Sequence, residues 1–297
     1  MQIVTANGTQ IRGDLIKQAA LRYDLAPVPS TFEAIIRVDD DLSRQLADGS
    51  LVNVNGDDYQ IIKPEKGSGR ESQGNNSTDT IQITALLNAC APIAFVRRNA
   101  IIKENVLLTE IYRAAGAAIR PVVGDFRTDR FTCMVGQTPS FPIANLLQEE
   151  GGVVRWKKSA LSFFRVSDLF NQTPALILPD NATENIKSGF LERHEIPWFY
   201  STAPDGSLVY GNQTKARTAV FVPRKNRQQL FNLSRCLVQR KISKIEFNEG
   251  LFAGDLIAYQ GAASLVIVTA AHVFQSNTDG SGGNQYTKLW LSAMGGG

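Results

Sequence analysis

Two segments near opposite ends of the chain share one pattern of glycines and short apolar runs. Leu46 and Leu251 stand 205 positions apart, and the same offset relates five further pairs of similar residues. A glycine, a short apolar strand, a glycine turn and a second strand form the pattern of a β-hairpin, because glycine readily adopts the positive φ of a tight turn. The further pairs are Gly49 with Gly254, Leu51 with Leu256, Val52 with Ile257, Val54 with Tyr259, and Gly56 with Gly261.

Two interpretations of this similarity stay open. Glycine and alternating aliphatic residues are common, so two unrelated hairpins can match over such a short window. Alternatively, the chain holds two similar β-barrels, with their second strands at 59–62 and 265–269, displaced by one residue. The second interpretation predicts a mainly β protein with an α+β part: two β-barrel domains that flank a small α+β domain.

The chain of 297 residues suits two or three domains. We expect an N-terminal β-barrel domain at 1–90, an α+β domain at 91–180 and a C-terminal β-barrel domain at 181–297. Alternation of apolar and polar residues predicts the first strands. The polar, glycine-rich stretch at 63–78 predicts a mobile loop. The first-domain strands are expected at 32–38, 51–54 and 59–62.

The middle region mixes helical and strand patterns. Apolar residues at helical spacing predict a helix at 107–115 and a second helix that Ser140 caps and Gly151 and Gly152 end. A hairpin with its turn at Lys157 and Lys158 then follows. In the last region we expect strands at 197–200, 219–222 and 262–271, a helix at 227–238, and a flexible tail at 294–297.

Composition excludes several classes of protein. The formal net charge is only +3, and the densest basic runs, at 157–158 and 224–227, are short. A protein that binds nucleic-acid phosphates usually has a clustered basic face, which this sequence does not indicate. The N-terminus lacks the pattern of a signal peptide, and no apolar run is long enough to cross a bilayer. Cys90, Cys133 and Cys236 are odd in number and widely spaced, which predicts small buried side chains made in a reducing compartment.

Catalytic and metal-binding patterns are not found. The two histidines are isolated: His272 lies in an apolar run, which indicates a core role, and His194 lies among charged residues. A pair such as Asp125 and Glu149 could serve glycoside hydrolysis only if the fold brought it together. The sequence therefore predicts a non-enzymatic protein with no catalytic, cofactor-binding or metal-binding residues and no cofactor.

The order of three motifs resembles the tail hub proteins of bacteriophages, a family that includes the N-terminal part of the VgrG spike proteins of type VI secretion. The run at 137–151, which contains a helix with paired leucines, is followed by a hairpin. Together they look like the helix–hairpin element of these hubs, at 139–166. Segment 46–62 resembles the first barrel hairpin of the family, and segment 254–272 resembles its closing barrel.

The resemblance implies a homotrimer in which each chain supplies two barrels, so that a threefold ring presents six similar units to a sixfold tube. It implies a structural hub in the tail or baseplate of a virion, made in the host cytoplasm. The tail tube protein, a tail tip or spike protein and other baseplate proteins would be its partners, DNA would pass transiently, and no membrane anchor is expected. The alternatives are a distal tail or terminator ring protein, a tail-associated cell-wall hydrolase and a nucleic-acid-binding module.

Overall fold

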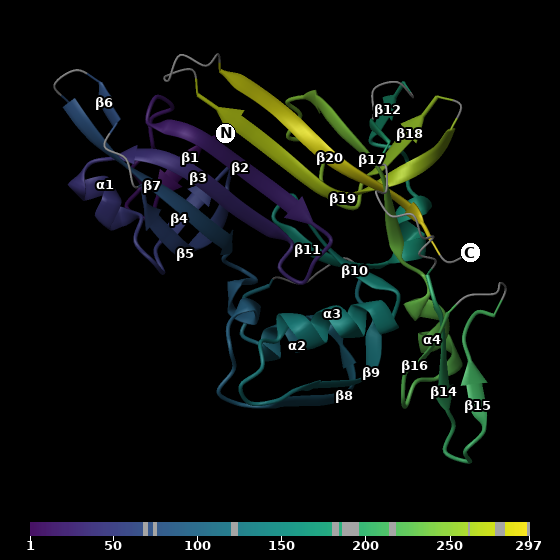
Figure 1. Cartoon of the computed structure of the whole chain (residues 1–297). Helices are drawn as coiled ribbons and strands as arrows, with labels where there is room; N and C mark the ends of the chain where they lie inside the picture. The colour runs from purple at the N-terminus through teal and green to yellow at the C-terminus, as the bar shows by residue number, and fades with distance from the viewer. Residues whose placement is uncertain are drawn as a thin grey trace.

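The protein is described from a computed structural model of the 297-residue chain. The structure describes residues 1–67, 71–73, 76–119, 124–179, 184–185, 196–213, 218–260, 262–276 and 283–295. Within these ranges the fold is mainly β with a few short helices, and its largest feature is a curled, half-barrel sheet across the top of Figure 1.

The first region forms one side of this sheet. In β3 every second residue is buried, as expected of a strand with one face on a core. The side chain of Asp39 caps α1 by accepting a hydrogen bond from the Leu42 N–H at 2.8 Å. The elements are β1 (Ile3–Thr5), β2 (Ile16–Asp24), β3 (Ser30–Val38), α1 (Asp40–Gln45), β4 (Leu51–Val54), β5 (Asp57–Lys66), β6 (Glu71–Gln73) and β7 (Asn76–Leu87).

The middle region lies below the sheet in Figure 1 and carries α2 and α3 beside two separate strand pairs. Leu108, Ile111 and Tyr112 of α2 are buried, which confirms the predicted apolar helix face. The elements are η1 (Ala91–Ala94), β8 (Ile101–Leu107), α2 (Leu108–Ala114), β9 (Arg127–Cys133), α3 (Ser140–Glu149), β10 (Gly152–Lys157), β11 (Ala160–Arg165) and η2 (Val166–Phe170).

The last region completes the sheet and adds a small module of three strands and α4, at the lower right of Figure 1. The elements are β12 (Leu176–Leu178), β13 (Glu184–Asn185), β14 (Trp198–Thr202), β15 (Leu208–Tyr210), β16 (Ala219–Phe221), α4 (Arg227–Leu233), β17 (Leu237–Glu246), β18 (Leu256–Tyr259), β19 (Ala262–Gln275) and β20 (Asn284–Met294).

Among the described residues, thirteen strands from the two ends of the chain join in a single sheet, and β14, β15 and β16 stay separate from it. Its main path runs β1-β4-β5-β7-β3-β2-β19-β20-β17-β13, and β2 and β19 connect the two ends of the chain. One buried core extends from Ile3 in the first region to Phe163 in the middle region, and it also includes Ala253 of the last region. Closure of either half into a barrel, and the predicted domain boundaries, stay predictions.

Several local predictions were wrong. The stretch predicted as a mobile loop is largely strand: β5 continues to Lys66, which pairs with Ile81, and β6 pairs with β7. Residues 68–70 and 74–75 of that stretch lie outside the described residues. Ser140 is the first residue of α3 and not its cap, because Pro139 holds the N-cap position without a side-chain hydrogen bond.

Three element ends also differ from the predictions. The β10–β11 turn is formed by Lys158 and Ser159, both at positive φ, so Lys157 is the last residue of β10. Helix α4 ends at Leu233, because the residues that follow leave the helix and β17 pairs with β20 from Leu237 onward. Met294 still belongs to β20, and the Gly295 N–H donates to the Cys236 carbonyl at 2.8 Å, whereas 296–297 lie outside the described residues.

Candidate assembly site: duplicated hairpins and the insert that joins them

The hairpins β4–β5 and β18–β19 have equivalent strand pairing. Val52 pairs with Tyr59 in the first hairpin, and Ile257 pairs with Leu265 in the second. The first strands of the two hairpins are thus related by the 205-residue offset and the second strands by 206. This is the one-residue displacement seen in the sequence.

The glycine before each hairpin has the same backbone role. Gly49 has φ +79° and donates its N–H to the Ile61 carbonyl at 2.8 Å. Gly254 has φ +86° and donates its N–H to the Ile267 carbonyl at 2.7 Å. Both positions require the left-handed backbone region that glycine tolerates best.

The equivalence extends beyond the hairpins to five strands at each end of the chain. We call β2, β3, β4, β5 and β7 the first unit, and β13, β17, β18, β19 and β20 the second unit. The sheet order is β4-β5-β7-β3-β2 in the first unit and β18-β19-β20-β17-β13 in the second. Each unit also has a β-bulge at the matching place, after Ile61 in β5 and after Ile267 in β19. The two units therefore share one strand topology.

The predicted hairpin residues lie in these matching strands. Asn55 and Gly56 form the β4–β5 turn with φ of 51° and 95°, as the asparagine–glycine pair predicts. Gly261 lies outside the described residues, and the role of this set in closed barrels stays a prediction. Buried members of the set are Val52, Val54, Gly254, Leu256, Ile257 and Tyr259; Leu51 is half-buried, and Gly49 and Gly56 are exposed.

The two units meet through β2 and the second half of β19. Residues Thr269–Gln275 pair with Asp24–Gln18 in antiparallel register. His272 lies in this part of β19 and is buried: its Nδ1 lies 3.0 Å from the Thr287 hydroxyl oxygen and its Nε2 lies 3.1 Å from the Leu251 carbonyl oxygen. Burial lowers the pKa of His272 below its usual value, which favours the neutral ring. The predicted core role of His272 is confirmed, and His194 lies outside the described residues.

The β10–β11 hairpin of the middle region contacts the first unit through Asp57. Trp156 donates its indole N–H to Asp57 Oδ2 at 2.7 Å, and the Ser159 hydroxyl donates to Oδ1 at 2.6 Å. Asp57 is the first residue of β5, directly after the β4–β5 turn. We call the middle region, from η1 to η2, the insert. These two hydrogen bonds attach the insert to the turn end of the β4–β5 hairpin.

The same hairpin contacts the second unit through Asp255, whose side chain is 3% exposed. The Arg155 guanidinium pairs with Asp255 Oδ1, and the Lys157 ammonium lies 2.6 Å from the same oxygen. Asp255 stands directly after Gly254, and its equivalent in the first unit is the half-buried Ser50. A buried carboxylate shared by two cations thus fixes the insert on the second unit.

Sequence reasoning missed this ion cluster. The sequence predicts Lys157 in a hairpin turn, and about a hundred positions separate it from Asp255. The periodic patterns that reveal strands carry no information about which distant charge will meet a given side chain. The other basic run is likewise used in the fold: Lys225 forms an ion pair with Glu149 at 2.6 Å.

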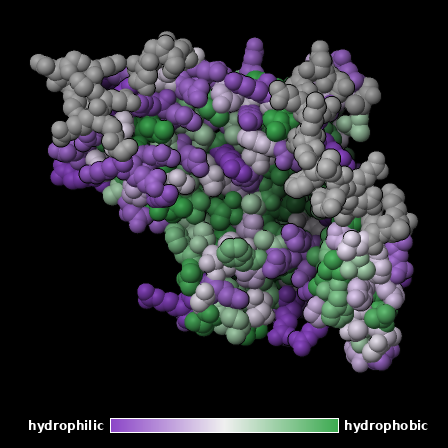
Figure 2. Space-filling model, viewed as in Figure 1, coloured by the Kyte–Doolittle hydropathy of each residue, from purple (hydrophilic) through white to green (hydrophobic). Residues whose placement is uncertain are grey.

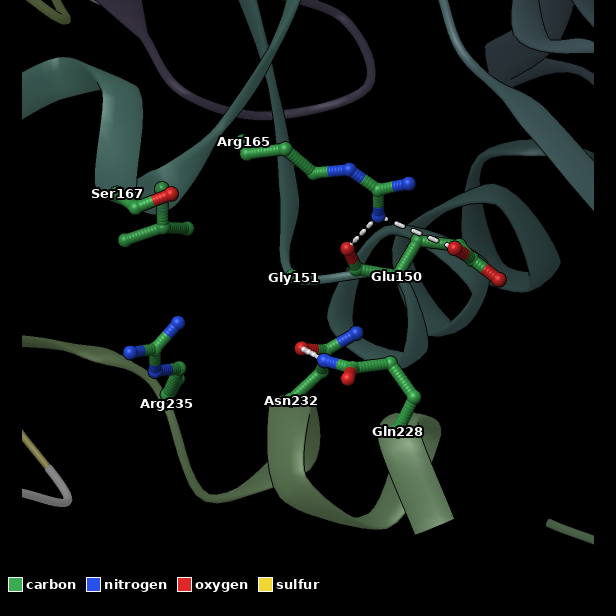
Figure 3. Close-up of a pocket in the computed structure, with 8 residues that line it drawn as sticks. Glu150, Gly151, Arg165, Ser167, Gln228, Asn232 and Arg235 are labelled. Carbon is green, nitrogen blue, oxygen red and sulfur yellow. Dashed lines mark hydrogen bonds and ion pairs between the residues drawn. The ribbon is translucent and has the colours of Figure 1, made fainter. Parts of the chain in front are cut away.

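An open pocket of about 320 Å³ lies where the end of α3 and η2 face α4 (Figure 3). Arg165 hydrogen-bonds the carboxylate of Glu150 at 3.1 Å. Asn232 accepts a hydrogen bond from Gln228 at 2.9 Å and donates to the Glu149 carbonyl at 3.0 Å. The contacts in this pocket join the insert to the α4 module.

The carboxylates considered for hydrolysis are engaged elsewhere. Asp125 accepts hydrogen bonds from the Thr109 and Phe126 N–H groups at 3.2 and 2.8 Å, whereas Glu149 pairs with Lys225. In the described part of the chain no group of three or more histidine, cysteine or acidic residues could hold a metal ion. No helix within the same part is long and apolar enough to cross a membrane.

Comparisons with known proteins place the fold. No protein-family model matches the chain, and no curated protein matches it. A tail protein of Neisseria meningitidis is similar in structure, with a TM-score of 0.66 and 11% identity over 98% of this chain and 95% of that protein. The 43 kDa tail protein of prophage MuSo2 from Shewanella oneidensis has a TM-score of 0.65 and 13% identity over 98% of both chains.

A third similar structure is an Escherichia coli component of the type VI secretion system, which itself resembles tail proteins of bacteriophage T4. Its TM-score is 0.56 with 10% identity, over 98% of this chain and 76% of that protein. Identities this low show the fold alone, and they confirm at that level the resemblance seen in the sequence. The chain has the fold that bacteriophage tail proteins share with a component of type VI secretion.

Proposed function

We propose that the protein is a structural hub of a phage or phage-like tail, in which three copies form a ring around a channel and join the sixfold tail tube to the threefold tail tip. The observation that carries this proposal is the duplicated five-strand unit, in a fold shared with phage tail proteins. The role is scaffolding and not catalysis, and the binding energy comes from extended interfaces between strands and subunits.

The junction inside the chain supplies a pattern for the junction between copies. In the sheet order, the last strand of the first unit is β2. It pairs with residues 269–275 of the second unit. The equivalent last strand of the second unit is β13, at the far end of the sheet path. The segment equivalent to 269–275 begins at Lys63 in β5, where Lys63–Lys66 pair with β7 and with no second strand among the described residues. Pairing of these two edges in successive copies would repeat the internal junction.

The exposure of the two equivalent segments supports this arrangement. Ala270 and His272 lie in the part of β19 that pairs with β2, and they are 0% and 2% exposed. In the equivalent segment, Lys63 and Lys66 are exposed. Pro64 has no N–H to donate, and Lys63 forms an ion pair with Glu65 at 2.8 Å. A junction between copies would therefore depend more on side chains than the internal one does.

Head-to-tail contacts of this kind close into a ring when the rotation between copies closes. Three copies present six units, which would meet a sixfold tube on one side and a threefold tip on the other. The expected partners are the tail tube protein, a tip or spike protein and other baseplate proteins. DNA would pass through the channel without sequence readout, and the protein would reside in the virion tail after assembly in the host cytoplasm.

The first test is the native mass of the purified full chain, together with negative-stain images of the same sample. A trimer with a threefold ring and a central hole is the expected result. A hexamer would instead favour a distal tail or terminator ring protein. A protein that stays monomeric alone and also with its tube protein would overturn the hub.

A paired variant tests whether the second hairpin is needed for assembly. Leu256→Asp with Ile257→Asp places two charges at positions that are 4% and 0% exposed, which should destroy the second unit and abolish particle formation. Infectious particles from this variant would contradict the proposal.

Two activity assays address the remaining alternatives. Clearing of bacterial cell walls would favour a hydrolase, and strongly salt-dependent DNA binding would favour a nucleic-acid-binding module.

A further inference from the structure

Exposed apolar side chains gather at one end of the α+β insert. Ten large hydrophobic residues are exposed in the described part of the chain, and six of them lie around the start of β8, the end of β9 and the start of α3. We call these six the tip patch. They are Phe95, Val96, Ile102, Met134, Val135 and Phe141, with exposures from 46% for Phe95 to 73% for Phe141.

Backbone contacts bring the three segments of the tip patch together. Ile102 pairs with Thr132 across the β8–β9 ladder. The Arg97 N–H donates to the Gln137 carbonyl at 3.0 Å, and the Gly136 N–H donates back to the Arg97 carbonyl at 2.9 Å. The six side chains thus belong to one continuous end of the insert. In Figure 1, β8 and β9 lie at the lower edge of the insert, on the side away from the sheet, and in the same view Figure 2 shows hydrophobic and hydrophilic residues mixed over the lower part of the molecule.

The tip is held in place by the insert itself. Arg97 extends its guanidinium to the Ala115 carbonyl at the end of α2, at 3.2 Å. The Gln137 side chain accepts a hydrogen bond from the Met134 N–H at 2.7 Å. A surface that is already fixed loses little conformational entropy when a partner binds. The tip patch is therefore a preorganised apolar surface.

The chemistry of the tip matches the core of a protein interface. The exposed side chains of the tip patch are two phenylalanines, two valines, an isoleucine and a methionine, and the exposed Arg98 and the half-buried Arg97 lie beside them. Interface cores are enriched in aromatic residues, methionine and arginine, and are depleted of lysine and acidic residues. Contiguous exposed apolar surface of this kind marks an interaction site.

Charge decides which partner fits. No carboxylate forms an ion pair with Arg97 or Arg98 among the described residues, so the charge on the tip is positive. A twofold contact between two copies through this patch would use the same surface on both sides, so the arginines of both copies would enter one interface. Like charges there are unfavourable, whereas carboxylates around an apolar surface would complement the arginines.

We propose that the tip patch binds a different protein of the same particle, through an apolar surface rimmed by carboxylates. The inference rests on the proposed tail function, since that function supplies the particle. Phe141 is the expected anchor, because it has the greatest exposure in the patch and large aromatic side chains carry much of the binding energy in interfaces. Arg98 would pair with the rim.

The test compares two surface variants in assembled particles. Val135→Gln with Phe141→Gln replaces two of the three most exposed side chains of the tip patch. Leu208→Gln with Ile177→Gln is the matched control, since these residues are 52% and 65% exposed and lie in β15 and β12, away from the tip. Both variants should keep the native mass and thermal midpoint of the parent. The tip variant, and separately Arg98→Glu, should reduce incorporation of the protein into particles by at least about tenfold, and the control should not.

A photo-crosslinking residue at position 141 identifies the occupant. The expected product is a crosslink in intact particles to an acidic segment of one other structural protein. Unchanged incorporation of the tip variant, a crosslink to a second copy of this chain, or binding to vesicles of phosphatidylglycerol that the tip variant loses would overturn the inference. A native mass that is not trimeric would count against the hub alone, because the crosslink reports the partner whatever the number of copies.

Discussion

The two five-strand units share a topology but differ in what surrounds them. Hairpins β4–β5 and β18–β19 have matching registers, matching glycines and matching bulges. Beside them, β4 pairs with the antiparallel β1, whereas β18 pairs with the parallel β12. The half-buried Ser50 of the first unit corresponds to the buried Asp255 of the second. Backbone geometry is thus alike where the hairpin requires it. The side chains differ where the insert binds, because it contacts Asp57 in the first unit and Asp255 in the second.

The comparison between Ser50 and Asp255 gives the largest expected effect. Asp255→Ala leaves Arg155 and Lys157 without their shared carboxylate, and should lower the free energy of unfolding by about 3–5 kcal/mol, the usual cost of breaking a buried ion pair. Ser50→Ala in the first unit should change it by less than about 0.5 kcal/mol. Urea unfolding of both variants measures the difference, and equal losses would mean that the ion cluster does not distinguish the units.

The contact of the insert with the first unit should be weaker than its contact with the second. Trp156→Phe keeps an aromatic ring and removes the hydrogen bond from the indole N–H to Asp57. The expected loss is about 1.5–3 kcal/mol, as for other hydrogen bonds to charged groups. Urea unfolding measures it, with Trp290→Phe in β20 as a control for the change of ring. A loss larger than that of Asp255→Ala would reverse the order of the two contacts.

The paired glycines sharpen the comparison at the backbone level. Alanine at Gly49 or Gly254 must adopt a positive φ, which costs about 1–2 kcal/mol. A Cβ at Gly49 would meet nothing within 4 Å, whereas at Gly254 it would lie 3.1 Å from the Arg155 Cδ. We therefore expect Gly254→Ala to be the more destabilising of the two in thermal unfolding. A smaller effect at Gly254 would show that Arg155 moves without loss.

The smallest expected effect concerns pH. His272 has a lowered pKa in the folded state, whereas the unfolded chain has the ordinary histidine pKa of about 6.5. Below that pH the folded protein therefore binds fewer protons than the unfolded chain. Its contribution to stability is complete above that pH and is lost as the pH falls towards the folded pKa. His272→Gln should flatten the fall in unfolding free energy between about pH 7 and 5. Urea unfolding at several pH values measures the slope, and an equally steep fall in the variant would contradict this prediction.

This fold was predictable where short-range patterns determine it. The alternation at 32–38, the asparagine–glycine turn at 55–56 and the apolar face of α2 each depend on neighbouring residues, and each was found. The polar stretch after Lys63 was predicted as a loop because glycine, serine and asparagine favour turns. It is largely strand because β7 provides hydrogen-bonding partners that the local sequence does not reveal.

The sequence by itself determined the mainly β class, the two similar hairpins and the offset between them, because glycine positions and the alternation of apolar residues act through local backbone geometry. Only the tertiary structure decided that β2 pairs with β19 to join both units in one sheet. It alone placed Arg155 and Lys157 on Asp255, and gathered the tip patch from three segments. These contacts join residues far apart in the chain, and the packing that selects them leaves no periodic pattern in the sequence.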